Sequence, residues 1–410
     1  MNFYKNILVL KIIALLFIFL FTSCEDVNTS SIFDEDTDTG NTPVISSVEP
    51  SEFALAGYDE ITITGNYFSD VLDDENGNKV YFDNELAQII SATKNELKVI
   101  SPVKGGEDFL IKVVVPGALN FGEFAPYKLK LIAEKISGVA VIDEITALAM
   151  DLDDNLYMHL LSDNVYKISP DGTREEYAEI PFPKASDMKY GKENYIYVLR
   201  SNNQTLYRIP PGGGAAIEYV TFASRMRGFD FDNEQNIYAL GTRTGTHVYT
   251  STGNLRELNA FSTLDVWEVK IHEDFLYVAA RGSGGGIFRA PITSSNGDLG
   301  SEEEVFSWSN AMQFADNDIL GFGISANGDV IVTTSNSPDP ILNIAPDGIA
   351  TPLYEGVLIP PEVSSVPVTN IVWGNDESFF ISRYNSNSDS TASNGVYKVF
   401  YGQGTNYFGR

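Results

Sequence analysis

The sequence holds one cysteine, three histidines and three tryptophans among its 410 residues. A single cysteine excludes an intrachain disulfide. The histidines His159, His247 and His272 stand in different repeats, without the spacing of zinc ligands. No Gly-x-Ser-x-Gly, phosphate-loop or zinc motif occurs either. These absences exclude several enzyme classes, and we predict a protein that is not an enzyme and needs no cofactor.

Basic residues are also scarce. Lysine and arginine number 27 against 56 aspartates and glutamates, which gives a formal net charge of −29. Nucleic acid and anionic membrane surfaces attract clustered positive charge, so neither is expected as a partner of the whole chain. Apolar runs are short: Ile12–Phe21 is too short to span a bilayer as a mature helix, but it is long enough for the core of a signal peptide.

Residues 1–23 have the features of such a targeting segment, with lysines before the apolar run. The segment ends at Phe21-Thr22-Ser23-Cys24, which resembles the lipobox of bacterial lipoproteins, with phenylalanine in place of the usual leucine. The resemblance implies that Cys24 is lipidated and becomes the new N-terminus. An ordinary secretory signal is the alternative.

Residues 24–42 are polar and acidic, and we expect a disordered linker. The linker opens with Glu25-Asp26, which resembles the acidic signal that directs lipoproteins of the Bacteroidota to the outer face of the outer membrane. The resemblance implies an outer-membrane protein that faces the exterior and touches the membrane only through its lipid anchor.

The pattern of short strand-like runs in residues 43–132 predicts a separate all-β unit. Apolar and polar residues alternate over Ile61–Thr64, and further short strand-like runs follow with turn signals between them, as in a small β-sandwich. The opening Pro-x-Ile-x-x-Val-x-Pro pattern and the turn Gly65–Phe68 resemble the IPT/TIG immunoglobulin-like domain. This resemblance implies an Ig-like sandwich that acts as a spacer.

The remaining residues, 133–410, repeat one unit six times. Each unit centres on an apolar residue that tyrosine usually follows. The central pairs are Leu156-Tyr157, Ile196-Tyr197, Ile237-Tyr238, Leu276-Tyr277, Val330-Ile331 and Phe379-Phe380. The steps between their residue numbers are 40, 41, 39, 54 and 49. A period of this length, with four short strands per unit, predicts the blades of a propeller.

The repeats resemble six-bladed propellers of the NHL type. The predicted fold is therefore all-β, an IPT/TIG sandwich followed by a six-bladed β-propeller. The last unit leaves few residues for a fourth strand after Phe400. We expect the strand-like segment Glu134–Ile142, which precedes the first unit, to supply the outer strand of the last blade and leave no edge unpaired.

Arginines recur at one place in the repeat. Four stand where the second strand of a unit ends, and two lie in a loop before a first strand. They are Arg200, Arg243, Arg281 and Arg383, and Arg225 and Arg227. In a propeller with up-and-down strands, both positions lie on the same face. Guanidinium groups bind carboxylates, sulfates and sugar hydroxyls, so we predict a ligand-binding face, with pairing to nearby acids as the alternative.

Aromatic residues are expected on the same face. Trp308 and Tyr384 stand in or beside its loops, and Trp267 follows another loop there. Such rings can stack against the apolar face of a sugar, although packing between blades is the alternative for Trp267. The two longest steps place extra loop residues at 309–318 and 360–367, and long loops are often functional.

This combination resembles surface glycan-binding lipoproteins of the Bacteroidota, which work beside an outer-membrane importer. The resemblance implies a non-catalytic protein that binds an extracellular polysaccharide through one propeller face. One alternative is a hydrolase or lyase with a metal in the channel, as in gluconolactonase-like propellers, held by acids such as Asp151, Asp230 and Asp232. Those aspartates are interpreted as turn residues, so no metal site is predicted. A protein–protein interaction module is the other alternative.

Overall fold

The structure is a computed structural model that describes residues 40–72, 76–161, 164–201, 203–310, 319–335, 339–356, 367–384 and 394–405. These residues form two compact units, one drawn from residues before Lys128 and one that contains the chain from Lys128 onward. Within the described ranges the only helical segments are two 3-10 turns, Lys192–Asn194 and Trp308–Asn310, and no helix there is long and apolar enough to cross a membrane. Cys24 lies outside these ranges.

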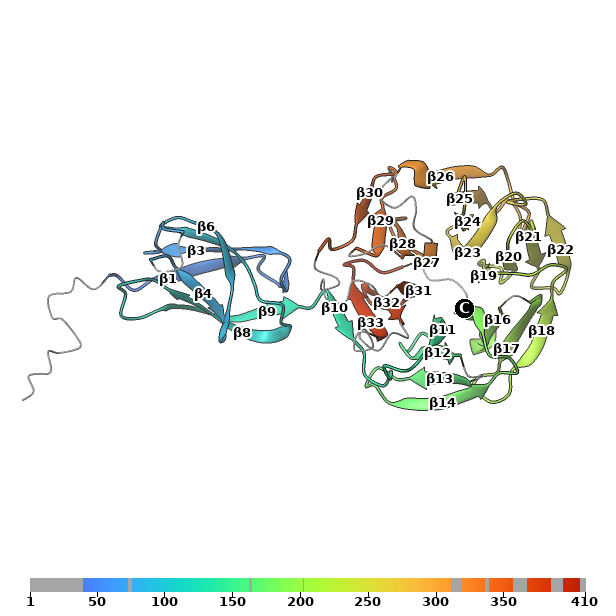
Figure 1. The fold of residues 1–410 in the computed structure, drawn as a ribbon, viewed down its shortest axis with the longest axis horizontal. Helices are drawn as coiled ribbons and strands as arrows, with labels where there is room; N and C mark the ends of the chain where they lie inside the picture. Colours follow the sequence, from blue (N-terminus) through green and yellow to red (C-terminus); the bar gives the residue numbers. More distant parts are fainter. Residues whose placement is uncertain are drawn as a thin grey trace, which may run out of the picture. The chain divides into compact units, whose positions relative to one another are not determined.

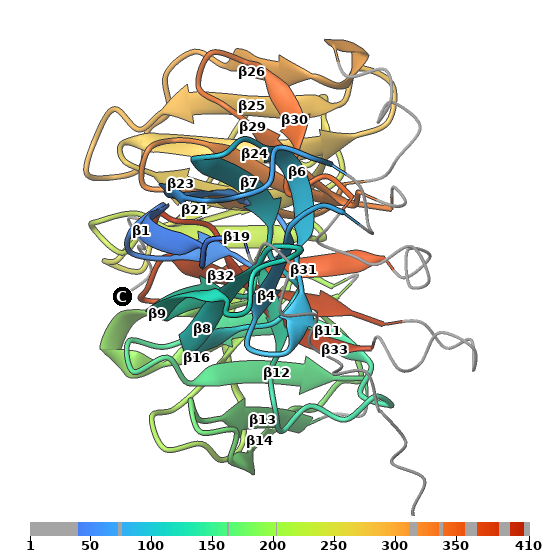
Figure 2. The same cartoon turned by 90° about the vertical axis from the view of Figure 1, so that its left-hand side faces the viewer.

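The first unit is a β-sandwich of two layers (Figures 1 and 2). One sheet has the order β1 (Val44–Glu49), β3 (Glu60–Asn66), β7 (Glu96–Ile100) and β6 (Gln88–Ala92). The other has the order β2 (Ala54–Leu55), β9 (Gly122–Lys130), β8 (Gly106–Val114), β4 (Lys79–Phe82) and β5 (Glu85–Leu86). Alternate residues such as Ile61, Ile63, Val80 and Phe82 are fully buried, as expected when one face of each sheet meets the core.

The predicted turn Gly65–Phe68 of this unit depends on its glycine. A Cβ atom at Gly65 would lie only 2.5 Å from the Phe68 ring and closer still to the Val44 carbonyl oxygen. Tyr67 follows with φ at 65°, in the left-handed region. The side chain of Asn95 fixes the turn by donating to the Gly65 carbonyl over 3.1 Å. Any larger residue at position 65 would force β1 and β3 apart.

The second unit is a ring of six four-stranded antiparallel sheets, as predicted (Figure 1). Blades one to three are β11 (Ile145–Met150), β12 (Leu156–Leu160), β13 (Asn164–Ile168) and β14 (Arg174–Glu179); β15 (Ala185–Tyr190), β16 (Ile196–Arg200), β17 (Thr205–Ile209) and β18 (Ile217–Thr221); and β19 (Gly228–Phe231), β20 (Ile237–Leu240), β21 (Thr246–Tyr249) and β22 (Leu255–Leu258). Blades four to six are β23 (Asp265–His272), β24 (Phe275–Arg281), β25 (Gly286–Pro291) and β26 (Glu303–Ser307); β27 (Ile319–Ile324), β28 (Val330–Thr334), β29 (Ile341–Ile344) and β30 (Ala350–Pro352); and β31 (Val368–Trp373), β32 (Ser378–Arg383), β33 (Gly395–Phe400) and β10 (Ala133–Lys135).

Every predicted central pair falls in the second strand of its blade. These strands are buried along their length in β12, β20 and β28, whereas the outer strands β14 and β22 leave several residues exposed. A second strand is covered on both faces by the neighbouring blades, so it reads as a continuous apolar run, while an outer strand is solvated and polar. This difference in burial produces the repeat that is visible in the sequence.

The ring closes between the two ends of the propeller, as predicted. Strand β10 pairs antiparallel with β33 through Ala133↔Val399, Glu134↔Lys398 and Lys135↔Tyr397. The strand is shorter than the predicted Glu134–Ile142, and its pairing ends with the Ile136 N–H donating to Val396 at 3.0 Å. Closure by the first strand of the unit gives the last blade its fourth strand and leaves no edge open there.

Proline at position 134 is expected to lower the free energy of unfolding by about 1–3 kcal/mol, because it removes a backbone donor of the closing ladder. Ladder bonds flank this residue at Ile132 and Ile136, and alternate residues of an antiparallel strand share the same bonding side. Urea denaturation of Glu134→Pro would measure the loss. Ala133→Pro is the matched control, since its N–H faces away from β33, and an equal loss in both variants would contradict the closure role.

Candidate functional site

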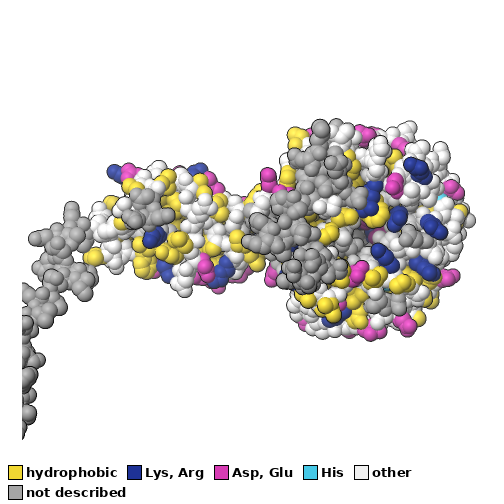
Figure 3. Space-filling view, viewed as in Figure 1, with side chains coloured by type: hydrophobic (Ala, Val, Ile, Leu, Met, Phe, Trp, Pro, Cys, Tyr) yellow, Lys and Arg dark blue, Asp and Glu magenta, His cyan; other side chains and the backbone are white. Residues whose placement is uncertain are grey.

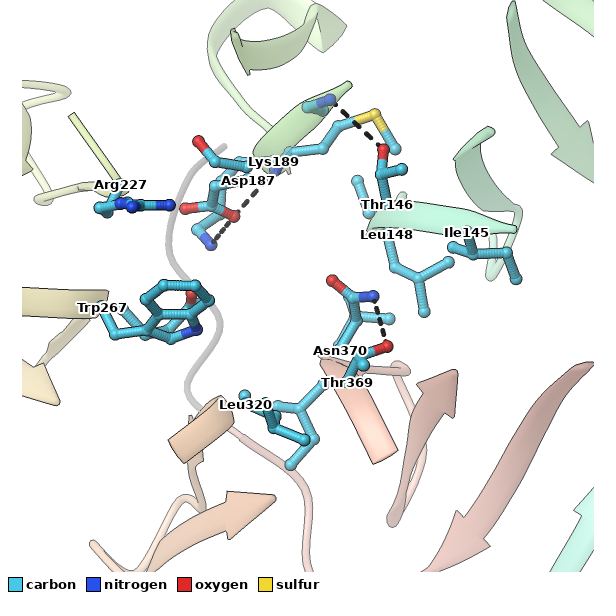
Figure 4. Close-up of a pocket in the computed structure, with 18 of the residues that line it drawn as sticks. Ile145, Thr146, Leu148, Asp187, Lys189, Arg227, Trp267, Leu320, Thr369 and Asn370 are labelled. Atoms are coloured by element: carbon cyan, nitrogen blue, oxygen red, sulfur yellow. Dashed lines mark hydrogen bonds and ion pairs between the residues drawn. The ribbon is translucent and has the colours of Figure 1, made fainter. Parts of the chain in front are cut away.

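The centre of the propeller contains a cavity of about 340 Å³. It is lined by residues of β11, β15, β19, β23, β27 and β31, the innermost strands of the six blades (Figure 4). Its lining includes Glu144, Lys184, Ser201, Arg227 and Tyr384, which stand where innermost strands begin or second strands end. The cavity therefore reaches the face on which the sequence predicts a ligand.

Charged side chains from three successive blades form one wall of the cavity, here called the charged wall. Its members are Asp187 and Lys189 from β15, Asp230 from β19, and Glu268 and Lys270 from β23. Residues two apart on a strand point to the same side, which places each acid beside its lysine. Lys189 Nζ lies 2.8 Å from an Asp187 carboxylate oxygen, and Lys270 Nζ lies 3.2 Å from a Glu268 carboxylate oxygen.

The aspartates of the charged wall also join neighbouring blades. The Phe229 N–H of the third blade donates to Asp187 over 3.0 Å. The Ile271 N–H of the fourth blade donates to Asp230 over 2.7 Å. Each carboxylate thus accepts a backbone bond from the blade that follows it, and this bond fixes the spacing of the innermost strands.

Burial and mutual attraction set the protonation of this wall. Burial alone disfavours the Lys189 ammonium, but Asp187, Glu268 and Asp230 outweigh it and raise the pKa of Lys189. Burial, with repulsion from Lys189, lowers the pKa of Lys270. Burial likewise raises the pKa values of Glu268 and Asp230. The network holds Lys189 as a cation and makes Lys270 the amine that loses its proton more readily.

Apart from Glu144 at the cavity edge, the described residues of the opposite wall are uncharged. This wall is built by the fifth, sixth and first blades from Leu148, Ala149, Leu320, Gly321 and Val372. The polar side chains there include Thr369 and Asn370, and Asn370 Nδ2 donates to Thr369 over 3.2 Å. In the close-up these residues face the charged wall across the opening (Figure 4).

Arg227 and Trp267 stand together at the edge of the cavity (Figure 4). The Arg227 guanidinium carbon lies 4.8 Å from the centre of the Trp267 ring, and that of Arg281 lies 3.1 Å from it. Arg281 is further held by Nε, which donates to the Ile319 carbonyl over 2.7 Å. Cation–π contacts of this kind give a flexible arginine a fixed position. Trp267 therefore lies at the cavity rather than only between blades.

The other predicted arginines stand at the expected end of the blades but have different surroundings. Arg200 and Arg383 pair with the first residues of β15 and β31, Ala185 and Val368. Arg200 lies 5.6 Å over the Phe182 ring, and Arg225 and Arg243 are exposed. Of the six, Arg227 lines the cavity.

Arg383 requires a correction, because it is not an exposed loop residue. Its residue surface is 3% exposed, and its guanidinium carbon lies 5.7 Å from the Tyr397 ring. Burial lowers its pKa. The sixth blade continues β32 to Arg383, so the side chain lies within the blade instead of in the loop beyond it.

Trp308 was predicted to lie in or beside a loop of the ligand-binding face, but its side chain is buried. It is 7% exposed and packs edge-on against Phe306 at 5.7 Å, in a core cluster with Ile319 and Phe322. The residue begins a 3-10 turn directly after β26, which points its ring back into the blades. Tyr384, by contrast, is half-buried and lines the cavity. Of the predicted extra loop residues, 311–318 and 360–366 lie outside the described ranges.

Two of the aspartates considered as metal ligands fill turns. Asp151 accepts from the Asn155 side chain and the Tyr157 hydroxyl, each at 2.9 Å. Asp232 repeats the arrangement with Asn236 and Tyr238, at 2.7 and 2.9 Å. Within the described ranges, no three His, Cys, Asp or Glu side chains are grouped to hold a metal.

Asp230 was interpreted as a turn residue, and this is wrong. Asp230 belongs to β19 and lines the channel, and the turn begins only at Asp232. The other residues of the charged wall were not predicted from the sequence. A signal was present: the innermost strands ASDMKY and DVWEVKIH carry charges two residues apart inside otherwise apolar segments. Buried strands rarely keep such charges unless they are paired.

Comparison with known proteins supports the architecture. Residues 43–130 match the IPT/TIG domain family. No curated protein matches the chain. An auxiliary nutrient binding protein from Bacteroides thetaiotaomicron has a similar structure, with a TM-score of 0.57, 14% identity, and 89% of this chain and 99% of that chain covered. One from Bacteroides ovatus has a TM-score of 0.52, 15% identity, and coverage of 88% and 98%.

The propeller fold also occurs in an enzyme. A luciferin-regenerating enzyme matches with a TM-score of 0.52, 14% identity, and coverage of 68% of this chain and 98% of that chain. At such identities these likenesses establish the fold and not the activity. The chain is an all-β protein, an IPT/TIG sandwich followed by a six-bladed β-propeller.

Proposed function

We propose that this chain is a non-catalytic lipoprotein of the outer-membrane surface, which binds an extracellular polysaccharide and supports nutrient uptake. The observation that carries the proposal is the propeller cavity of about 340 Å³, lined by Arg227 and Trp267 on the face that bears the arginines. Pockets that bind small ligands are concave and combine apolar walls with a few fixed polar groups. The charged wall and the uncharged wall opposite give the cavity both.

Further support comes from similar solved structures and from the parts of the chain that precede the propeller. Two similar structures are described as auxiliary nutrient binding proteins. In this proposal Cys24 carries the lipid anchor, the IPT/TIG domain spaces the propeller from the membrane, and an outer-membrane importer receives the ligand. Mass spectrometry of the mature N-terminus would test the anchor, and cleavage at another residue would refute it.

Affinity electrophoresis against a panel of plant, algal and microbial polysaccharides tests the binding function. Trp267→Ala is expected to weaken binding to the retarding polysaccharide at least tenfold, because Trp267 lines the cavity and contacts both Arg227 and Arg281. Tyr219→Ala is the matched control: Tyr219 is also half-buried, but it packs against Tyr197 and Tyr249 in the second and third blades. Binding that survives Trp267→Ala would place the site elsewhere. Shortened chains in the incubation mixture would show catalysis instead.

A further inference from the structure

The charges that line the cavity are balanced, although those of the chain are not. Of the described lining residues, four are basic and four are acidic, whereas the whole chain has 27 basic and 56 acidic residues. Five of the eight form the charged wall, and the others are Glu144, Lys184 and Arg227. Within the charged wall both lysines have a carboxylate partner, and Asp230 accepts two backbone N–H groups. The wall therefore satisfies its own charges.

Arg227 is different from these paired cations. Its side chain is half-buried at the cavity edge, and its guanidinium forms no hydrogen bond or ion pair with any described residue. Its neighbour there is the Trp267 ring, at 4.8 Å. Although the chain has a large excess of acids, no carboxylate of the described residues pairs with this half-buried guanidinium. Lys184, exposed at the same edge, adds a second cation.

The Arg227 guanidinium is also held in place before any ligand arrives. Arg281 is fixed by the Ile319 carbonyl and lies on Trp267, and Trp267 in turn lies against Arg227. A planar guanidinium with free N–H groups accepts a carboxylate or sulfate through two parallel hydrogen bonds. Because the side chain is already positioned, little conformational entropy is lost on binding.

The size of the cavity limits what enters it. Its volume of about 340 Å³ is at the lower end of the roughly 300–1,000 Å³ of ligand pockets. Such a space holds one or two sugar rings rather than a long stretch of chain. The uncharged wall can take the apolar face of a ring, while Asn370 and Thr369 present polar groups to its hydroxyls.

We propose that the cavity binds the end of an acidic oligosaccharide and that Arg227 receives the anionic group of its terminal sugar. This inference rests on the proposed function and narrows it to one class of ligand. The shared chemistry is an anionic substituent on a pyranose, either a carboxylate of a uronic acid or a sulfate ester. Trp267 and Arg281 act as positioning residues for Arg227.

Isothermal titration of the mature protein with matched sugars tests the inference. The probes are glucose, galactose and mannose, the uronic acid of each, and the 6-sulfate of each, which differ only at C6. We expect at least one acid or sulfate to bind ten or more times tighter than its neutral counterpart, with affinity falling as salt rises. The separate carboxylate and sulfate arms distinguish the two sources of the anion.

Variants of Arg227 test whether this residue recognises the anionic group of the sugar. Arg227→Ala should abolish the preference for the charged sugar, and Arg227→Lys should restore part of it. Arg208→Ala is the control, because Arg208 lies over Tyr195 and Tyr219 and does not line the cavity. The melting temperature of each variant shows whether it is folded. Since Arg227 has no described polar partner to lose, we expect little change.

The length of the oligosaccharide tests whether the cavity binds the end of the sugar chain. Digalacturonate and octagalacturonate, or the corresponding oligomers of whichever sugar binds, should have similar affinity per molecule. An affinity that rises steeply with length would overturn end binding. Equal affinity for neutral and charged sugars, or a preference that survives Arg227→Ala, would overturn the anionic class while the proposed function stands. Failure of every sugar and every polysaccharide would overturn both.

Discussion

Replacing Asp187 by alanine is expected to lower the free energy of unfolding by about 3–5 kcal/mol, the usual cost of breaking a buried ion pair. Asp187 and Lys189 are 6% and 7% exposed at their side chains, and their charged atoms lie 2.8 Å apart. Without the carboxylate, Lys189 remains buried with its nearest counter-charge gone. The Phe229 N–H of the next blade also loses its acceptor. Denaturation in urea, monitored by tryptophan fluorescence, would measure the change.

Two further variants separate the charge from the hydrogen bond. Asp187→Asn keeps an acceptor for the Phe229 N–H but removes the charge, so it should be less destabilising than Asp187→Ala. Adding Lys189→Met to Asp187→Asn removes the unpaired cation and should recover part of the stability. If Asp187→Ala unfolded at the same urea concentration as the parent protein, the charged wall would have no structural role.

Replacing Trp308 by alanine is expected to cost a similar amount, about 3–5 kcal/mol, because the change leaves a cavity in the core. The ring is 7% exposed and packs against Phe306 in the cluster between the fourth and fifth blades. Ligand affinity of the folded protein should not change, since Trp308 does not line the cavity. Denaturation and titration of the same preparation would measure both quantities.

Trp267→Ala is the comparison for this prediction, and it should show the opposite balance. Trp267 is half-buried at the cavity edge, so its loss should affect binding more than stability. If Trp308→Ala weakened binding without lowering stability, the loop after β26 would belong to the site, as the sequence alone suggested. The pair of tryptophans therefore tests whether the propeller cavity or its outer loops recognise the ligand.

The two functional hypotheses differ in how they use the charges of the channel. A metal-dependent enzyme needs several carboxylates that converge on one ion. In the described part of the channel, Asp187 and Glu268 are paired with lysines and Asp230 accepts backbone N–H groups. These carboxylates hold the blades together, and among the described residues the cavity edge presents Arg227 and Lys184, together with Glu144, to a ligand. This arrangement favours recognition of an anion over coordination of a cation.

The sequence by itself determined the number of blades, their order and the segment that closes the ring. Those features depend on local patterns: the apolar second strand of each repeat, the polar turns and the extra strand before the first unit. The same local patterns show where each second strand ends. The sequence alone therefore predicted that arginines such as Arg200 and Arg281 lie at one end of the blades.

Only the tertiary structure decided which of these residues meet. Arg227 and Trp267 line the cavity, while Arg383 and Trp308 are buried, although all four stand near the same end of their blades. The charged wall joins residues from three blades that lie about forty positions apart in the chain. The direction of each side chain relative to the axis depends on how neighbouring blades pack, and that is fixed only when the ring closes.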